Sequence, residues 1–279
     1  NCYIECMKKA LLRFIDTLMH RWLRIPYRLH SVRFRSPKSP RQTVILLHGL
    51  GNSSKSWRTI AKQLPSDVRV IGIDLLGFGE SPKPTWATYT MATQVRAIAR
   101  TVVALRLNQR VTVIGHSMGA LVAIELAKRY PLVIKQLVLC SPPLYSDNSD
   151  KTFNQDRILR DFYESLRQHP DRLQRVAPMA AKLGIVGTSF NIQGRRVQHY
   201  VAALEAGIIH QTSLVDAGQL RLPITILYGT FDPVVIGSRI RELARSHTNI
   251  IVKSFPVGHE ITGRFQDIVA RELLLLLKN

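Results

Sequence analysis

A serine in the sequence Gly115-His116-Ser117-Met118-Gly119 has the spacing G-x-S-x-G. The apolar residues before it suit a buried strand, and those after it have helical periodicity. A serine on such a sharp strand-to-helix turn presents its hydroxyl as a nucleophile, and the glycines let neighbouring chain segments approach closely. The N-terminus of the following helix also favours negative charge beside the turn. The pentapeptide therefore predicts attack by Ser117 on an acyl carbon.

Two further side chains have the types and the chain order that would activate this serine. Asp232 and His259 each follow an apolar, strand-like run, so the order along the chain is Ser…Asp…His. A histidine takes the serine proton as general base and returns it as general acid, while a carboxylate holds the imidazole in the required tautomer. We therefore predict a catalytic triad of Ser117, Asp232 and His259.

Backbone donors for the developing negative charge are expected on two turns. His48-Gly49-Leu50-Gly51 follows another apolar run, where a backbone N–H group can face the acyl oxygen. We expect the N–H groups of Leu50 and Met118 to form an oxyanion hole, supported by His48, Gly49, Gly51, Gly115, His116 and Gly119. The sequence has no metal-ligand cluster and no dinucleotide fingerprint, so we predict neither a metal nor another cofactor.

The elements that must position these residues alternate along the chain. Short apolar runs predict strands at residues 44–47, 68–73, 111–114, 137–140, 224–228 and 250–255. Helical periodicity predicts helices at residues 57–64, 90–107, 118–129, 238–247 and 264–278. Residues 27–34 alternate as a further strand would. This alternation predicts an α/β fold with a mostly parallel central sheet and helices on both faces.

The alternation lapses in residues 143–220, where helical stretches at 155–168 and 196–209 occur without buried-strand runs. The simplest organisation is an α/β core formed by residues 27–142 and 221–279, interrupted by a helical cap at 143–220. Residues 1–26 precede this core. Within them, residues 7–24 predict a basic amphipathic helix with one apolar face formed by Leu11, Ile15, Leu18 and Trp22.

Taken together, these motifs resemble those of the α/β-hydrolase superfamily, from about residue 41 to the end apart from the cap. The stretch Asp74-Leu75-Leu76-Gly77-Phe78-Gly79-Glu80-Ser81 is similar to the D-x-x-G-x-G-x-S turn of many members, and we interpret Asp74 and Ser81 as structural. The resemblance implies an α/β-hydrolase fold with the cap over the active site. Haloalkane dehalogenases and epoxide hydrolases of this fold carry an aspartate nucleophile, so Ser117 argues against both.

The pentapeptide is similar to those of monoglyceride lipases, small esterases, C–C bond hydrolases of aromatic meta-cleavage products and cofactor-free perhydrolases. We expect a serine carboxylesterase or lipase that cleaves a small or medium acyl or aryl ester, monoglycerides included, through an acyl-enzyme. A C–C bond hydrolase with the same triad and a ligand-binding homologue without activity are the alternatives.

The expected cap favours an apolar acyl or aryl group in the substrate. Apolar side chains are frequent in residues 176–190 and 201–209, and a pocket needs only a few of them. His199, Tyr200 and His210 are candidate polar contacts. The near-neutral charge of residues 143–220 does not indicate a strongly anionic substrate.

The chain carries a net charge of +20, and residues 1–42 alone hold ten basic residues against Glu5 and Asp16. Such a field favours acidic partners, but we interpret the charge mainly as a feature that keeps the protein in solution. No nucleic-acid-binding motif occurs, so we predict no nucleic-acid partner. We expect the basic N-terminal helix to pack on the body or around the mouth of a pocket, and peripheral contact with an anionic membrane is the alternative. Three sparse cysteines and the lack of a membrane-spanning apolar run favour a cytoplasmic protein, with a membrane-peripheral location as the alternative.

Overall fold

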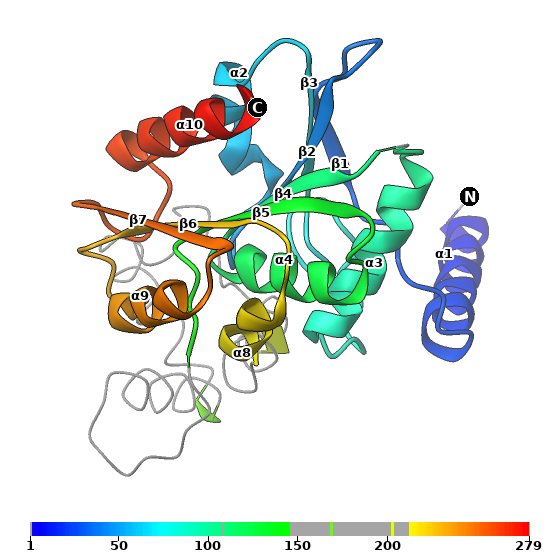
Figure 1. The fold of residues 1–279 in the computed structure, drawn as a ribbon. Coiled ribbons are helices and arrows are strands. Elements are labelled where there is room, and N and C mark those ends of the chain that lie inside the picture. The colour runs from blue at the N-terminus through cyan, green and yellow to red at the C-terminus, as the bar shows by residue number, and fades with distance from the viewer. Residues whose placement is uncertain (1, 108, 146–167, 170–201, 204–211, 279) are drawn as a thin grey trace.

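One central sheet organises the molecule. The computed structural model of the chain describes residues 2–107, 109–145, 168–169, 202–203 and 212–278. Within this part of the chain, seven strands form a sheet in the order β1-β3-β2-β4-β5-β6-β7 (Figure 1). Their bounds are β1 Ser31–Arg35, β2 Gln42–Leu47, β3 Val68–Ile73, β4 Val111–His116, β5 Ile134–Cys140, β6 Ile224–Gly229 and β7 Ile250–Phe255. Each of the six apolar runs predicted as strands lies in this sheet.

The sheet is parallel except at one edge. β1 is antiparallel to β3, and every other neighbouring pair in the sheet is parallel. Near the centre, Leu47 of β2 lies beside Ile73 of β3 and Gly115 of β4. Parallel strands bring their carboxyl ends to the same edge, so the loops after β2, β4, β6 and β7 emerge together. The observed sheet confirms the predicted fold class.

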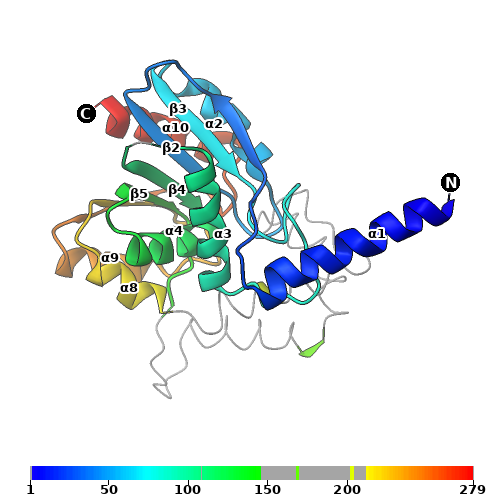
Figure 2. The same cartoon turned by 90° about the vertical axis from the view of Figure 1, so that its right-hand side faces the viewer.

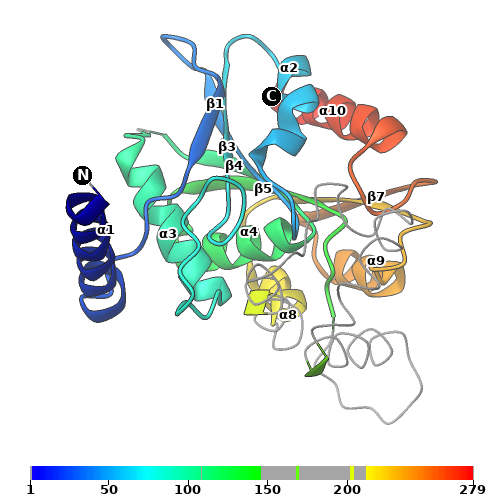
Figure 3. The same cartoon turned by 180° about the vertical axis from the view of Figure 1, so that it is seen from behind.

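Helices cover both faces of the sheet. On one face lie α2 (Arg58–Gln63), which is entered through the 3₁₀-helix η2 (Ser54–Trp57), and α10 (Gly263–Lys278). On the other lie α3 (Met91–Ala104), α4 (Met118–Arg129), α8 (Ser213–Gln219) and α9 (Gly237–Ser246) (Figures 1 and 3).

The buried strand β2 packs against the helices on both faces of the sheet. Its residues Val44 and Leu46 pack in the cluster that contains α2 and α10 side chains, while Ile45 and Leu47 pack in the cluster that contains α3 and α4 side chains. Burial on both faces explains why β2 is a continuous apolar run and not an alternating one.

The N-terminal helix stands apart from the sheet. α1 (Cys2–Asp16) continues into a π-helical segment, η1 (Thr17–Trp22), and Figure 2 shows α1 extending away from the body. The sequence predicts one helix at residues 7–24. The structure starts this helix earlier and widens its last turns, where the Leu23 N–H group donates to Leu18 O (2.9 Å). Arg24, with φ +52°, ends the helical path.

Most of the expected cap lies outside the described residues. Apart from residues 168 and 202–203, which are helical, the helices predicted at 155–168 and 196–209 fall in this part of the chain. The candidate contacts His199, Tyr200 and His210 fall there too. The last helix of the range, α8, packs against α4 and is tied to it by Lys128 Nζ, which lies 2.7 Å from Asp216 Oδ1. None of the helices described here has the length and apolar character needed to cross a bilayer.

Candidate active site

Ser117 occupies the turn between β4 and α4 with φ +52° and ψ −120°. This positive φ is uncommon for a residue with a side chain, and a strained strand-to-helix turn is typical of an exposed nucleophile. Two glycines permit the turn. A Cβ atom added to Gly115 would lie 2.3 Å from Gly119 O, and one added to Gly119 would lie 2.5 Å from Leu47 O. Ser117 is partly exposed although both of its chain neighbours are buried.

The loops after β6 and β7 bring Asp232 and His259 to this serine. His259 Nε2 lies 3.0 Å from Ser117 Oγ, and His259 Nδ1 lies 2.8 Å from Asp232 Oδ2. The two loops are joined by backbone hydrogen bonds, among them Thr230 N–H to Phe255 O at 2.7 Å. The structure thus brings together the three side chains predicted as a triad, although the serine and the histidine are 142 positions apart.

Burial and charge oppose each other at both His259 and Asp232. Burial lowers the pKa of His259, but the charge of Asp232 and the hydrogen bond to it outweigh burial and raise that pKa above its ordinary value of 6.5. Burial raises the pKa of Asp232, but the charge of His259, its hydrogen bond and the Val234 N–H group lower the net pKa below 3.8. Asp232 is therefore ionised at neutral pH and can stabilise an imidazolium.

His116 contacts the backbone of His259. Its Nε2 atom lies 3.0 Å from the backbone oxygen of His259, and the two rings have centroids 5.1 Å apart. Burial lowers the pKa of His116 to about 3, with the nearby His259 adding to the effect. His116 is therefore neutral at physiological pH, and its Nε2–H group donates to that carbonyl. This contact fixes the backbone of the histidine that faces Ser117.

The loop after β2 lies against the nucleophile turn. A Cβ atom added to Gly49 would lie 3.2 Å from Ser117 Cβ, and Gly51 has φ +73°. His48 holds the loop from inside the protein, because its Nδ1 lies 2.8 Å from Gly49 O and its Nε2 accepts the Leu75 N–H group at 2.9 Å.

This packing places the expected oxyanion donors on adjoining segments. Leu50 follows Gly49 on the β2 loop, and Met118 is the first residue of α4. The first N–H groups of a helix have no acceptor within the helix, so the Met118 N–H group is suited to bind an anion. Gly119, one residue further on, makes the close approach to Leu47 that brings the two segments together.

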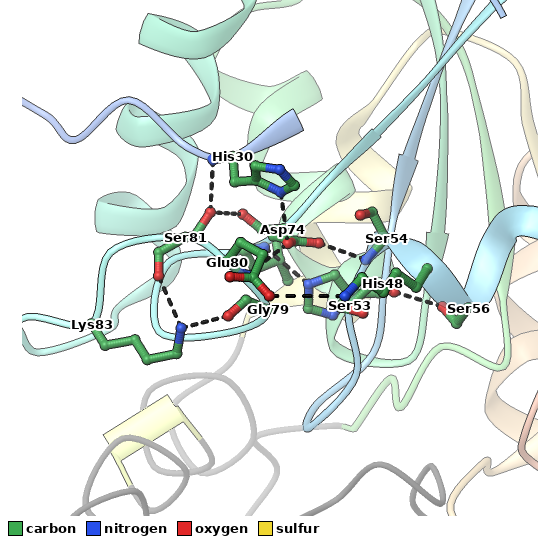
Figure 4. Close-up of polar contacts among 12 residues, drawn as sticks. His30, His48, Ser53, Ser54, Ser56, Asp74, Gly79, Glu80, Ser81 and Lys83 are labelled. Atoms are coloured by element: carbon green, nitrogen blue, oxygen red, sulfur yellow. Dashed lines mark hydrogen bonds and ion pairs between the residues drawn. The ribbon is translucent and has the colours of Figure 1, made fainter. Parts of the chain in front are cut away.

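The carboxylate of Asp74 organises the next loop, which follows β3 (Figure 4). Asp74 Oδ1 accepts the Ser54 N–H group at 2.6 Å, and Oδ2 accepts the Glu80 N–H group at 2.8 Å. Ser81 Oγ donates to Asp74 O at 2.6 Å. Gly79 is required here because it has φ +52° and an added Cβ would lie 2.2 Å from Asp74 Oδ2. Asp74 and Ser81 thus have the structural contacts that the sequence motif indicates.

Some contacts of the site have no signal in the sequence. Tyr145 lies inside the range expected for the cap, yet its hydroxyl donates to Val234 O at 2.8 Å and so holds the loop that carries Asp232. His30 precedes β1, and its Nδ1 lies 3.0 Å from Asp74 Oδ2. Both contacts join segments far apart in the chain, which no local pattern predicts.

Three possible metal-binding side chains meet within the described part of the chain. Ligand atoms of His116, His259 and Glu260 all lie within 4.8 Å of one another. Both ring nitrogens of His259 already face Ser117 and Asp232, and Nε2 of His116 faces a carbonyl oxygen. This arrangement fits proton transfer better than metal binding.

A family model described as "alpha/beta hydrolase fold" matches residues 42–261. Among curated proteins, the chain is similar to "Probable lysophospholipase BODYGUARD 4" of Arabidopsis thaliana, with 38% identity over 112 residues that make up 39% of this chain and 27% of that protein. The chain spans about a quarter of the length of the curated relatives it matches.

Solved structures match over nearly the whole chain. The crystal structure of bromoperoxidase from Bacillus anthracis has a TM-score of 0.74 at 21% identity and covers 90% of this chain and 95% of its own. A thermophilic esterase from Thermogutta terrifontis has a TM-score of 0.68 at 22% identity and covers 90% and 93%. At these identities the likeness is one of fold.

Proposed function

Because the chain belongs to the α/β-hydrolase fold family, we propose that it is a serine hydrolase that cleaves carboxylic esters through an acyl-enzyme. The observation that carries the proposal is the continuous set of contacts from Ser117 Oγ through both nitrogens of His259 to Asp232. A fold alone does not define a reaction, but a nucleophile, a base and an orienting carboxylate in contact have the geometry of acyl transfer.

In the first half of the proposed reaction, Ser117 Oγ attacks the ester carbonyl carbon while His259 Nε2 accepts the serine proton. Asp232 stabilises the resulting imidazolium. The N–H groups of Leu50 and Met118 bind the oxyanion of the tetrahedral intermediate. His259 then gives the proton to the leaving alcohol oxygen, the C–O bond breaks and Ser117 is acylated. A water molecule, deprotonated by His259, releases the acid in the second half.

The acyl group of the substrate is proposed to be apolar. The Arabidopsis relative is named as a probable lysophospholipase, whose substrate is a single-chain lipid ester, and this name supports a lipid-like acyl chain. We therefore choose lysophosphatidylcholine and a monoacylglycerol as test substrates to compare with simple esters.

We expect Ser117→Ala to reduce kcat for ester hydrolysis by roughly 10⁴- to 10⁶-fold, because it removes the nucleophile. The measurement is turnover of p-nitrophenyl esters from acetate to long acyl chains, together with the two lipid esters. Intact-protein mass spectrometry should detect an acyl adduct in the wild type and none in Ser117→Ala. Ser56→Ala is the matched control, because Ser56 is an exposed serine whose hydroxyl contacts only Ser53 O among the described residues.

Equal turnover in wild type and Ser117→Ala would contradict the proposal. If no ester is hydrolysed but a vinylogous diketone is cleaved in a Ser117-dependent way, the triad serves C–C bond hydrolysis instead.

A further inference from the structure

The N-terminal helix presents an apolar face that nothing in the described structure covers. Every described side chain from Ile4 to Asp16 is exposed. Six large apolar side chains recur at helical spacing and are 41–75% exposed: Ile4, Met7, Leu11, Ile15, Leu18 and Trp22. Contiguous exposed apolar surface of this kind marks sites of interaction with proteins or membranes.

The base of this helix is fixed to the body. Tyr27, which is buried in the core, donates its hydroxyl to Asp16 Oδ2 at 2.8 Å, and its ring stacks on His20 at 3.7 Å. Arg100 on α3 donates to Pro26 O. The helix therefore cannot turn its apolar face onto the sheet without breaking these contacts, and the face stays turned to the outside.

The charge of the segment indicates the chemistry of its partner. Residues 2–24 contain five basic residues against two acidic ones, and Asp16 is engaged by Tyr27. A second copy of this chain, itself at +20, would bring like charges together. An anionic phospholipid surface offers both an apolar interior for the stripe and negative headgroups for the basic side chains.

A cavity at the foot of the helix suits a phosphate headgroup. It measures about 410 Å³, and its lining includes Arg21, Arg24, Tyr27, Trp86 and Arg96. Among the described residues, no carboxylate forms an ion pair with any of these three arginines. Guanidinium groups without a carboxylate partner, beside aromatic walls, can bind a phosphate next to glycerol and acyl carbons.

We propose that α1 and η1 lie in the headgroup region of an anionic phospholipid bilayer, with the apolar stripe inserted and Arg21, Arg24 and Arg96 bound to lipid phosphates. The contact is in the membrane plane, because this helix is not among those that could cross a bilayer. Docking does not depend on catalysis, so it is tested in the Ser117→Ala background and stands or fails separately from the proposed activity.

The first experiment measures the apolar contribution. Ser117→Ala protein is sedimented with vesicles of phosphatidylcholine alone and of phosphatidylcholine with phosphatidylglycerol. We expect binding to the anionic vesicles, and at least about tenfold weaker binding after Leu11→Ser with Ile15→Ser, because two inserted side chains are lost. Val103→Ser with Leu132→Ser removes two apolar side chains elsewhere that are even more exposed (75% and 86%) and should leave binding unchanged.

The second experiment measures the charge contribution. Lys8→Gln with Arg21→Gln should weaken binding to anionic vesicles and reduce its dependence on salt. Arg245→Gln with Arg264→Gln removes the same charge from exposed positions on α9 and α10 and should have a smaller effect. Trp22 fluorescence should shift to shorter wavelength on binding, because its exposed indole enters a less polar region.

Equal sedimentation of the helix variants and their controls would overturn the proposal. So would a dimer that dissociates in Leu11→Ser with Ile15→Ser while no variant binds vesicles, since a second copy would then cover the stripe. Circular dichroism checks that the substituted chains are folded; since the substituted side chains are exposed, their loss should leave the core intact.

Discussion

At the scale of single residues, the Asp232 carboxylate sets the protonation of the site. It is buried, and it holds the pKa of His259 above the ordinary value despite the burial of that imidazole. A histidine base works only when it is neutral. The rate of the proposed reaction is therefore tied to pH through this one electrostatic contact.

Asp232→Asn should move the pH profile as well as slow the reaction. In the wild type, kcat/KM should rise with pH through the pKa of His259, above pH 6.5. The substitution removes the charge that raises this pKa and leaves the burial that lowers it, so the rising limb should move to lower pH. We expect kcat to fall by roughly 10⁴-fold. The measurement is kcat/KM for one ester from pH 5 to 9 in both proteins.

Asp216→Asn is the control for this experiment. It removes another buried carboxylate, which lies on α8 and contacts Lys128 and Thr212. The rising part of its kcat/KM profile should lie at the same pH as in the wild type. If the rising part of the kcat/KM profile stays at the wild-type pH in Asp232→Asn, Asp232 does not set the protonation of His259.

At the scale of elements, close backbone approaches join segments that belong to neighbouring strands of the sheet. Gly119 brings α4 against the end of β2, and Gly229 lies so near the β7 loop that an added Cβ would be 2.1 Å from Val257 O. Backbone atoms cannot rotate out of the way as side chains do. The positions of the loops that carry the site thus depend on the lack of a Cβ atom at Gly119 and at Gly229.

Gly119→Ala should therefore lower the free energy of unfolding by about 1–3 kcal/mol, because the new methyl group must displace Leu47 O or α4. It should also reduce the proposed esterase activity, since α4 carries Met118 beside the serine. Gly258→Ala is the matched control: its added Cβ meets nothing within 4 Å. Urea unfolding of both variants checks this, and equal stabilities would contradict the role given to the close approach.

The elements themselves were largely predictable from the sequence. The predicted bounds of β3 and α4 agree with the structure, because residues 68–73 are apolar apart from Arg69 and α4 begins directly after the Ser117 turn. Thr90 marks the start of α3 by accepting the Thr93 N–H group, as an N-cap residue does. The three triad positions follow from motifs at strand ends.

Other features depend on contacts between distant segments. The antiparallel pairing of β1 with β3, the hydroxyl of Tyr145 on the Asp232 loop and the π-helical turns at the end of the N-terminal helix have no local pattern of their own. The strand predicted at residues 27–34 is observed as β1 at Ser31–Arg35, because Leu29 and His30 bond to Thr101 and Ser81 side chains instead of to a neighbouring strand. Tertiary packing, and not the local sequence, therefore determines where this strand begins and ends.

At the scale of the whole molecule, charge and buried histidines make stability depend on pH. The chain carries +20, and acidification removes the carboxylate charges that offset its self-repulsion. Burial lowers the pKa of His48 as well as that of His116. Both imidazoles therefore stay neutral in the folded protein at pH values at which they would be protonated in the unfolded chain.

The protein should accordingly lose stability as the pH falls below about 6.5. Unfolded His116 binds a proton near pH 6.5, whereas folded His116 binds one only near pH 3, so protonation favours unfolding throughout that window. This one side chain contributes about 1.4 kcal/mol per pH unit. His116→Gln, whose amide can still donate to His259 O, should show a shallower loss of stability between pH 6 and 4. Denaturant unfolding measures the two slopes, and identical slopes would contradict the assignment.

The chain order of the triad has a consequence for protein synthesis. Ser117 and the oxyanion segments belong to the first half of the chain, but the histidine that activates the serine follows 142 residues later, beyond the last strand of the sheet. A nascent chain on the ribosome, or one cut before β7, holds the nucleophile without its base. On the proposed mechanism, hydrolytic competence arises only once the far edge of the sheet has been made and docked, and incomplete chains should be inert towards esters.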